Sequence, residues 1–223
     1  MSVRIYISLF LILVGCARSL AQQNDFVLLQ GVKLEKRLNQ RVAGTLSVQN
    51  MFNQNVSEWW IGFVDAGITL RLAKGWDTQF HLRQIRLQTP ENAVQHRQLY
   101  FHTLSWTGSK NKWAFSVRHR TQQLVFGEHF NNRFRGPFWY VRDRALVAYR
   151  INYYWRPYTA FEAFFPLNRP TRPTIDQVRW TLGFFRTFND HFKLETFYQL
   201  QQPVQRPNAT VRYVWGVNLF FIL

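Results

Sequence analysis

Apolar and polar residues alternate with a period of two along almost the whole chain, in segments of about ten residues separated by turn signals. The last twelve residues, RYVWGVNLFFIL, show the pattern: Tyr213, Trp215 and Val217 fall on one face, and Arg212 and Asn218 on the other. Successive side chains of a strand point to opposite faces, so this period predicts β-strands throughout. Beyond the N-terminus no apolar run reaches the length of a membrane-spanning helix. If the chain crosses a membrane, it does so as a closed β-barrel, because lipid cannot satisfy open backbone groups.

The alternation predicts about eleven strands, and single-chain bacterial barrels have even strand numbers, so ten or twelve are expected, with twelve preferred. The strand near 95–106 alternates poorly, and its faces are not assigned. The expected strands cover 26–37, 42–52, 60–72, 77–83, 95–106, 113–122, 142–153, 158–165, 177–184, 192–201 and 212–223.

Short turns and longer loops alternate between these strands, as in outer-membrane barrels whose short turns face the periplasm. Tryptophans gather near the expected strand ends, as side chains of a membrane interface do. The fold class expected is therefore an all-β, antiparallel, up-and-down transmembrane β-barrel of 10–12 strands; a soluble secreted or periplasmic β-sandwich or small barrel is the competing interpretation. The short turns are 73–75, 108–112, 156–157 and 189–190, and the long loops are 53–57, 88–94, 124–137, 166–175 and 203–208.

The N-terminus resembles a secretory signal peptide. Arg4 precedes a ten-residue apolar run, and Ser19, Leu20 and Ala21 form a small-x-small cleavage site. Residues 1–21 are expected to be removed, which leaves 22–223 as a single outer-membrane barrel domain. Leu13 to Cys16 also resembles a lipobox, in which Cys16 would be acylated. Cys16 is the only cysteine, so the mature chain is expected to lack disulfides and zinc–thiolate sites.

The charged residues carry the functional expectations, since the formal net charge is +16. Guanidinium groups pair well with carboxylates, and arginines outnumber carboxylates on the faces expected to line the lumen. Two interpretations stay open: a structural plug of ion pairs, or a narrow passage that attracts anions. A wide pore is not expected, because side chains fill a barrel of this size. The expected luminal charge network comprises Arg118, Arg120, Arg142, Arg144, Arg150, Arg179, Glu162 and Glu195.

Outer-membrane lipids and lipopolysaccharide are expected partners, together with the barrel-assembly machinery. Lipopolysaccharide phosphates could contact loop arginines, although these could equally be solvated. Nucleic acid is not expected, given the secretory signal. The loop arginines are Arg133, Arg135, Arg169, Arg172 and Arg206.

No catalytic, cofactor-binding or metal site is predicted. His119 lies near Ser116 and Glu128, but the strand period places His119 and Ser116 on opposite faces. No G-x-S-x-G nucleophile motif occurs, and the histidines lack metal-ligand spacing. A lipid-modifying barrel enzyme remains the alternative function.

Several stretches resemble a family of small outer-membrane barrels of Bacteroidota known as a domain of unknown function. They are WAFSVRHRTQQLVFGE, YVRDRALVAYRI, YTAFEAFFPL and QVRWTLGFFRTFNDHFKLETFYQLQQP. The resemblance covers most of the mature chain and implies a barrel fold and an outer-membrane location, but no activity.

Overall fold

The computed structural model describes residues 24–89, 93–126, 137–168, 174–204 and 209–223. These residues form eleven strands, from 11 to 17 residues long. The part of the chain so described contains no helix that is long and apolar enough to cross a membrane. The strands are β1 (Asn24–Arg37), β2 (Val42–Asn53), β3 (Glu58–Ala73), β4 (Trp76–Gln88), β5 (Val94–Lys110), β6 (Trp113–Phe126), β7 (Phe138–Tyr149), β8 (Trp155–Pro166), β9 (Gln177–Thr187), β10 (Phe192–Pro203) and β11 (Val211–Ile222).

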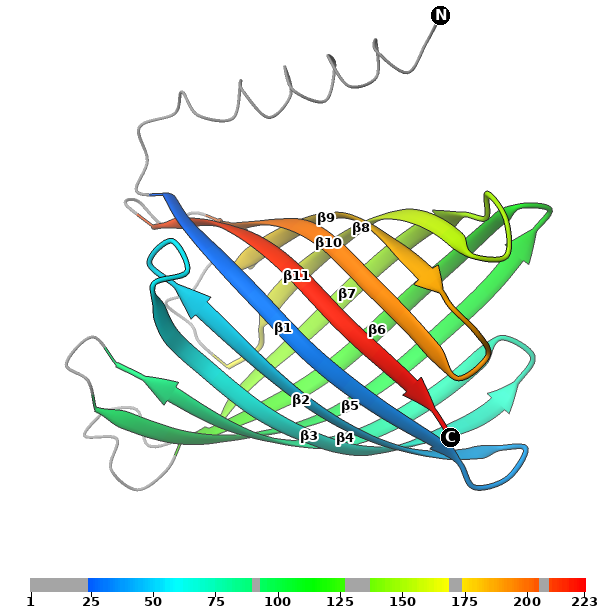
Figure 1. Cartoon of the computed structure of the whole chain (residues 1–223). Coiled ribbons are helices and arrows are strands. Elements are labelled where there is room, and N and C mark those ends of the chain that lie inside the picture. The colour runs from blue at the N-terminus through cyan, green and yellow to red at the C-terminus, as the bar shows by residue number, and fades with distance from the viewer. Residues whose placement is uncertain (1–23, 90–92, 127–136, 169–173, 205–208) are drawn as a thin grey trace, which may run out of the picture.

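The strands form one closed barrel in sequence order, and Figure 1 shows them tilted against the barrel axis. Every consecutive pair is antiparallel, and β1 closes the barrel by pairing in parallel with β11, from Asn24 opposite Val211 to Glu35 opposite Ile222. The all-β up-and-down barrel is thus confirmed. The expectation of an even strand number was wrong for the described residues: β1 is a full strand, and an odd count makes the closing pair parallel.

The odd strand count also separates the two ends of the chain. β1 begins at the mouth that carries the longer connections, and β11 ends at the mouth that carries the short turns (Figure 1). Two turns at the short-turn mouth contain left-handed residues, Gly75 with φ 79° and Asn111 with φ 57°, which glycine and asparagine tolerate best.

Asparagine side chains shape the other turns at this mouth. Asn39, Asn152 and Asn189 each accept hydrogen bonds from two backbone N–H groups two and three residues later. This local bonding favours a turn over a continued strand. The turn at 38–41 was not predicted from the sequence. Another turn was expected at 156–157, whereas the chain turns at 150–154 and Pro157 lies early in β8, where a strand tolerates proline.

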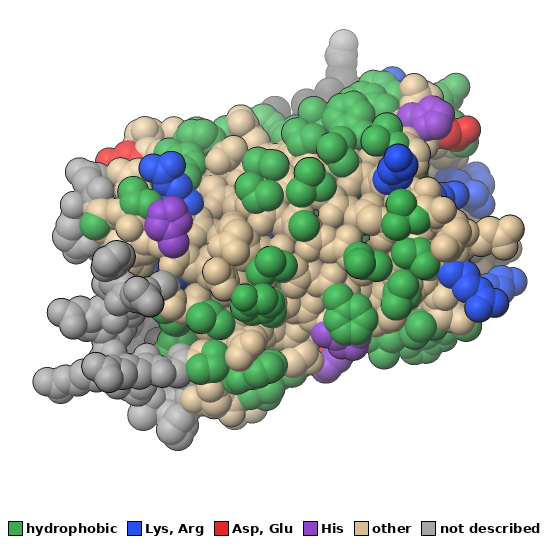
Figure 2. Space-filling view, turned by 90° about the horizontal axis from the view of Figure 1, so that it is seen from below, with side chains coloured by type: hydrophobic (Ala, Val, Ile, Leu, Met, Phe, Trp, Pro, Cys, Tyr) green, Lys and Arg blue, Asp and Glu red, His purple; other side chains and the backbone are tan. Residues whose placement is uncertain are grey.

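Apolar side chains cover much of the outer wall. Across β1, β2 and β3 the register aligns Val32, Val48 and Val64, and each is between 41 and 48% exposed. On the other side, Leu182 and Tyr198 stand beside Trp215. Figure 2 shows one face of this wall, with apolar side chains along it and Lys and Arg gathered mainly toward its ends. An exposed apolar surface of this extent marks a contact with lipid or protein.

Side chains of the inner face fill the barrel. Tyr158, Ala148 and Ala160 form a buried cluster against which Phe185 and Phe197 pack. Gly216 makes room for the Phe197 ring, because a Cβ at Gly216 would overlap that ring. A strand glycine under a neighbouring side chain is a common device of close packing. The interior is therefore packed at this level and leaves only part of the lumen open.

Candidate functional site

The register brings four of the predicted luminal charges into one row across four adjacent strands. Arg118 of β6 lies opposite Arg144 of β7, Arg144 opposite Glu162 of β8, and Glu162 opposite Arg179 of β9. All four point inward because they share the parity of the inner face. Sequence periodicity predicted that face for each residue, and the register makes them neighbours.

Glu162 is the centre of this cluster and is only 5% exposed. Its Oε1 accepts a hydrogen bond from Nη2 of Arg118. Nη2 of Arg142 lies 3.1 Å from each of its two oxygens. One buried carboxylate therefore pairs with two guanidinium groups, which leaves a net positive charge, and Arg179 lies opposite it in the register. A buried charge requires such pairing and hydrogen bonding.

Aromatic rings contact three of the inward guanidinium groups. The ring of Phe164 has Arg142 at 4.4 Å and Arg179 at 4.3 Å from its centroid. Arg120 lies 4.0 Å from the centroid of Phe101. Cations over aromatic faces gain attraction without requiring a carboxylate. The inner wall can thus hold more positive than negative charge.

A second inward cluster was not predicted as part of the network. Asp65 of β3 pairs with His81 of β4, and its other oxygen accepts a hydrogen bond from Nε of Arg83 at 2.9 Å and lies 2.9 Å from Nη2 in an ion pair. Arg83 also lies 4.1 Å from the centroid of Phe63. The sequence pattern contained this cluster, since Asp65, His81 and Arg83 lie on the polar faces of two consecutive expected strands.

Two residues of the predicted luminal charge network have different partners from those expected. Glu195 is buried, but neutral groups donate to it: the Tyr158 hydroxyl at 2.6 Å and the Asn218 amide at 2.8 Å. The expectation for Arg150 was wrong. It follows the end of β7, is exposed, and donates to the backbone oxygen of Asn111 in the neighbouring turn. The alternation that placed Arg150 inward does not continue past the end of the strand.

Arg120 and Arg144 carry positive charge without a direct ion pair. Nε of Arg120 donates to the Thr103 hydroxyl at 3.0 Å. Among the described carboxylates, none lies within 4 Å of the Arg120 or Arg144 guanidinium. These two residues therefore add to the positive charge that the two arginines paired with Glu162 already leave in the lumen.

A polar cavity of about 430 Å³ lies in the lumen between the two clusters and extends toward the short-turn mouth. Hydroxyl groups of Ser105, Thr107 and Ser116 contribute to its wall. Cations outnumber carboxylates around it, so an anion could find both charge and hydrogen-bond donors here. Its charged lining residues are Lys33, Arg83, Arg118, Arg120, Arg144, Asp65 and Asp77.

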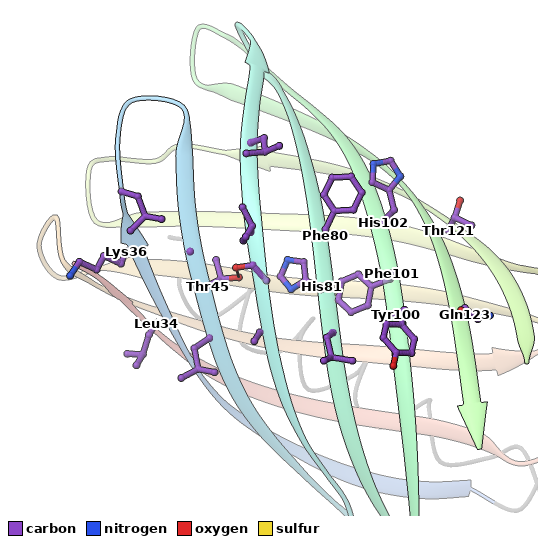
Figure 3. A pocket seen from close by; sticks show the side chains of 18 of the residues that line it. Leu34, Lys36, Thr45, Phe80, His81, Tyr100, Phe101, His102, Thr121 and Gln123 are labelled. Carbon is purple, nitrogen blue, oxygen red and sulfur yellow. Dashed lines mark hydrogen bonds between the residues drawn. The ribbon is translucent and has the colours of Figure 1, made fainter. Parts of the chain in front are cut away.

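A wider, mostly apolar depression of about 1220 Å³ is lined by residues of β1 to β7. Figure 3 shows Phe80, His102 and Thr121 side by side on three neighbouring strands. His102 makes a 2.7 Å hydrogen bond to Thr78 and lies against the ring of Phe80. This polar pair is satisfied within the wall, and the depression has the apolar character of a surface that contacts acyl chains.

The residues considered for catalysis do not converge. Ser116 lines the luminal cavity, whereas His119 points outward, as the strand period predicted, and lies 2.7 Å from Asp143. Glu128 lies outside the described residues. Within the described ranges, no three His, Cys, Asp or Glu side chains form a group that could hold a metal ion.

The fold and its inner wall define a closed β-barrel with a cationic, largely filled lumen. The chain belongs to the family described as Protein of unknown function (DUF2490), whose profile matches residues 28–212. The resemblance inferred from the sequence is thereby confirmed at the level of a family of unknown function. No curated protein sequence matches the chain.

The chain is similar in fold to several solved structures of low sequence identity. The NanC porin shares 10% identity over 78% of this chain and 86% of that chain, with a TM-score of 0.48. The outer-membrane-expressed OmpT of Vibrio cholerae shares 9% over 73% and 54%, with a TM-score of 0.41. The β domain of the Bordetella autotransporter BrkA shares 10% over 78% of each chain, with a TM-score of 0.46.

Proposed function

We propose that this protein is an outer-membrane β-barrel whose arginine-lined lumen is a narrow passage for small anions. The observation that carries the proposal is the luminal cavity bordered by Arg120 and Arg144, two cations with no direct carboxylate partner in the described structure. Fixed cations in a narrow lumen lower the energy of an entering anion and raise that of a cation.

The outer-membrane location is supported by the wall and by the sequence. The wall exposes apolar side chains along strands that are long enough to cross a bilayer at a tilt. The predicted signal peptide, which lies outside the described residues, supplies the route of export. Lipids, lipopolysaccharide and the barrel-assembly machinery are the partners that this location brings, and no nucleic acid or catalytic step is proposed.

The passage is tested by the reversal potential of the refolded protein in a planar bilayer under a potassium chloride gradient. We expect small conductance steps whose reversal potential has the sign of chloride selectivity. Cation selectivity would contradict the proposal. A folded, inserted protein without any conductance would instead support the interpretation of the arginine network as a structural plug.

The orientation of the barrel gives a separate prediction. If the longer connections face the outside, a short epitope in the turn 54–57 or directly before Asn24 is labelled by antibody on intact cells. An epitope in the turn 150–154 is labelled only after the outer membrane is permeabilised. β1 begins at the mouth with the longer connections, because its other end leads into the short turn at 38–41. Labelling of 150–154 on intact cells would show the opposite orientation.

A further inference from the structure

In the described part of the chain, the outer wall carries a histidine–aspartate pair near its middle. His119 lies near the centre of β6 and Asp143 near the centre of β7, and the register places them directly opposite each other. Nδ1 of His119 is 2.7 Å from Oδ1 of Asp143. Both side chains are about half exposed, at 52 and 50%. The pair therefore stands on the surface of the wall and not within it.

On a surface in contact with lipid, this pair would leave part of its hydrogen-bonding capacity unused. Nε2 of His119 and Oδ2 of Asp143 have no hydrogen-bond partner among the described residues. In the same register, Val117 and Ala145 lie on one side of the pair, and Thr121 and Val141 lie on the other, so Thr121 is the one polar outward neighbour on these two strands. Acyl chains cannot satisfy the open groups, and charges on the lipid face of a barrel are most costly near the bilayer midplane. This step rests on the proposed outer-membrane location.

We propose that the β6–β7 face is the interface between two copies of this chain, related by a two-fold axis along the membrane normal. Such an axis between β6 and β7 places β6 of one copy against β7 of the other at the same depth. His119 then meets the partner's Asp143, and Asp143 meets the partner's His119. A protonated imidazole donates at both nitrogens, so Nδ1 serves the Asp143 of its own chain and Nε2 serves the carboxylate of the other copy.

Charge complementarity favours a second copy over another protein as the occupant. The face presents one potential cation and one anion side by side, and a two-fold interface requires a surface that is complementary to itself. The four charged groups would balance one another and close each other's open hydrogen bonds. β6 and β7 also lie on the side of the barrel opposite β1 (Figure 1), so the closing β1–β11 pair is not involved.

Cysteine cross-linking tests the interface in native outer membranes. The natural chain has only Cys16, within the expected leader, so the unmodified protein supplies the baseline. Ala145→Cys places a thiol on the outer wall beside the pair. Val32→Cys, on β1, is the matched control, because Val32 is outward and 41% exposed. With a short bismaleimide we expect a dimer band at least fivefold stronger for Ala145→Cys than for Val32→Cys.

Two further variants test whether the dimer band depends on the His119–Asp143 pair or arises from random encounters between barrels in the membrane. In the Ala145→Cys background, His119→Leu with Asp143→Leu is expected to remove most of the dimer band. The exchange His119→Asp with Asp143→His keeps the surface complementary to itself and is expected to retain the band. Retention of a heat-shifted monomer on unboiled gels shows that each variant folds, and thereby separates failure of the interface from failure of the barrel.

Three outcomes, each with folded protein, would overturn the interface. They are equal cross-linking of the two cysteine variants, an unchanged band after the double leucine substitution, and cross-linking of Ala145→Cys only to a different protein.

Discussion

Replacement of Glu162 by glutamine is expected to destabilise the barrel by about 3–5 kcal/mol, the usual cost of breaking a buried ion pair from one side. Glu162 is 5% exposed and accepts hydrogen bonds from both Arg118 and Arg142. Glutamine keeps the shape but removes the negative charge, so the neighbouring guanidinium groups remain buried without compensation. The measurement is the urea concentration at the midpoint of unfolding of the refolded protein. The fraction of folded protein is read from the intensity of the heat-shifted band on gels.

The matched control for this variant is Glu195→Gln. Glu195 is also buried, but its donors are the neutral groups of Tyr158 and Asn218, so no cation is left unpaired. We expect Glu195→Gln to lower the free energy of unfolding by less than half as much as Glu162→Gln. Combining Glu162→Gln with Arg142→Gln should cost less than the sum of the two single changes, because the two residues interact directly. A Glu162→Gln protein within about 1 kcal/mol of the natural one would contradict the role of Glu162 as the centre of the cluster.

Replacement of both Arg120 and Arg144 by glutamine is expected to reduce chloride selectivity by roughly tenfold. A unit charge about 10 Å from a passing ion, at an effective dielectric near 20, contributes roughly 1.7 kcal/mol, and water in the lumen screens part of it. Neither residue has a direct carboxylate partner, so their removal leaves no unpaired anion. The reversal potential under a salt gradient measures the change.

The control for this pair is Lys112→Gln, a charge removed in a turn at the mouth and outside the luminal cavity. It is expected to leave the selectivity within about twofold, since solvent screens an exposed charge at that distance. Equal selectivity in the natural protein and in the Arg120 and Arg144 double variant would contradict the assignment of these residues to the passage.

The sequence predicted the strands and their faces because alternation is a local property. Arg118 and Glu162 were placed inward correctly for this reason. Their direct contact depends on the register between β6, β7 and β8, which periodicity does not contain. The faces of β5 could not be assigned because Phe101 packs inward beneath Arg120 while His102 points outward to Thr78, so both faces mix polar and apolar residues.

The strand number and the position at which β7 ends also differed from what the sequence predicted. Eleven strands require a parallel closing pair between β1 and β11, and a rule based on even-numbered barrels excludes it in advance. Arg150 shows that the period of two is informative only within a strand, because Asn152 accepts backbone hydrogen bonds just beyond it and begins a turn. The sequence alone did not predict the outward pair of His119 and Asp143, because their contact depends on the register between β6 and β7.

Electrophoresis of outer membranes, with and without boiling in SDS, tests most directly whether the chain is a closed membrane barrel. Closed barrels keep their backbone hydrogen bonds paired around the ring and resist unfolding by SDS. We expect the protein to stay with the membrane after carbonate extraction and to change its mobility only after boiling. A band released by carbonate, with the same mobility before and after boiling, would contradict the barrel in the membrane and with it the proposed anion passage.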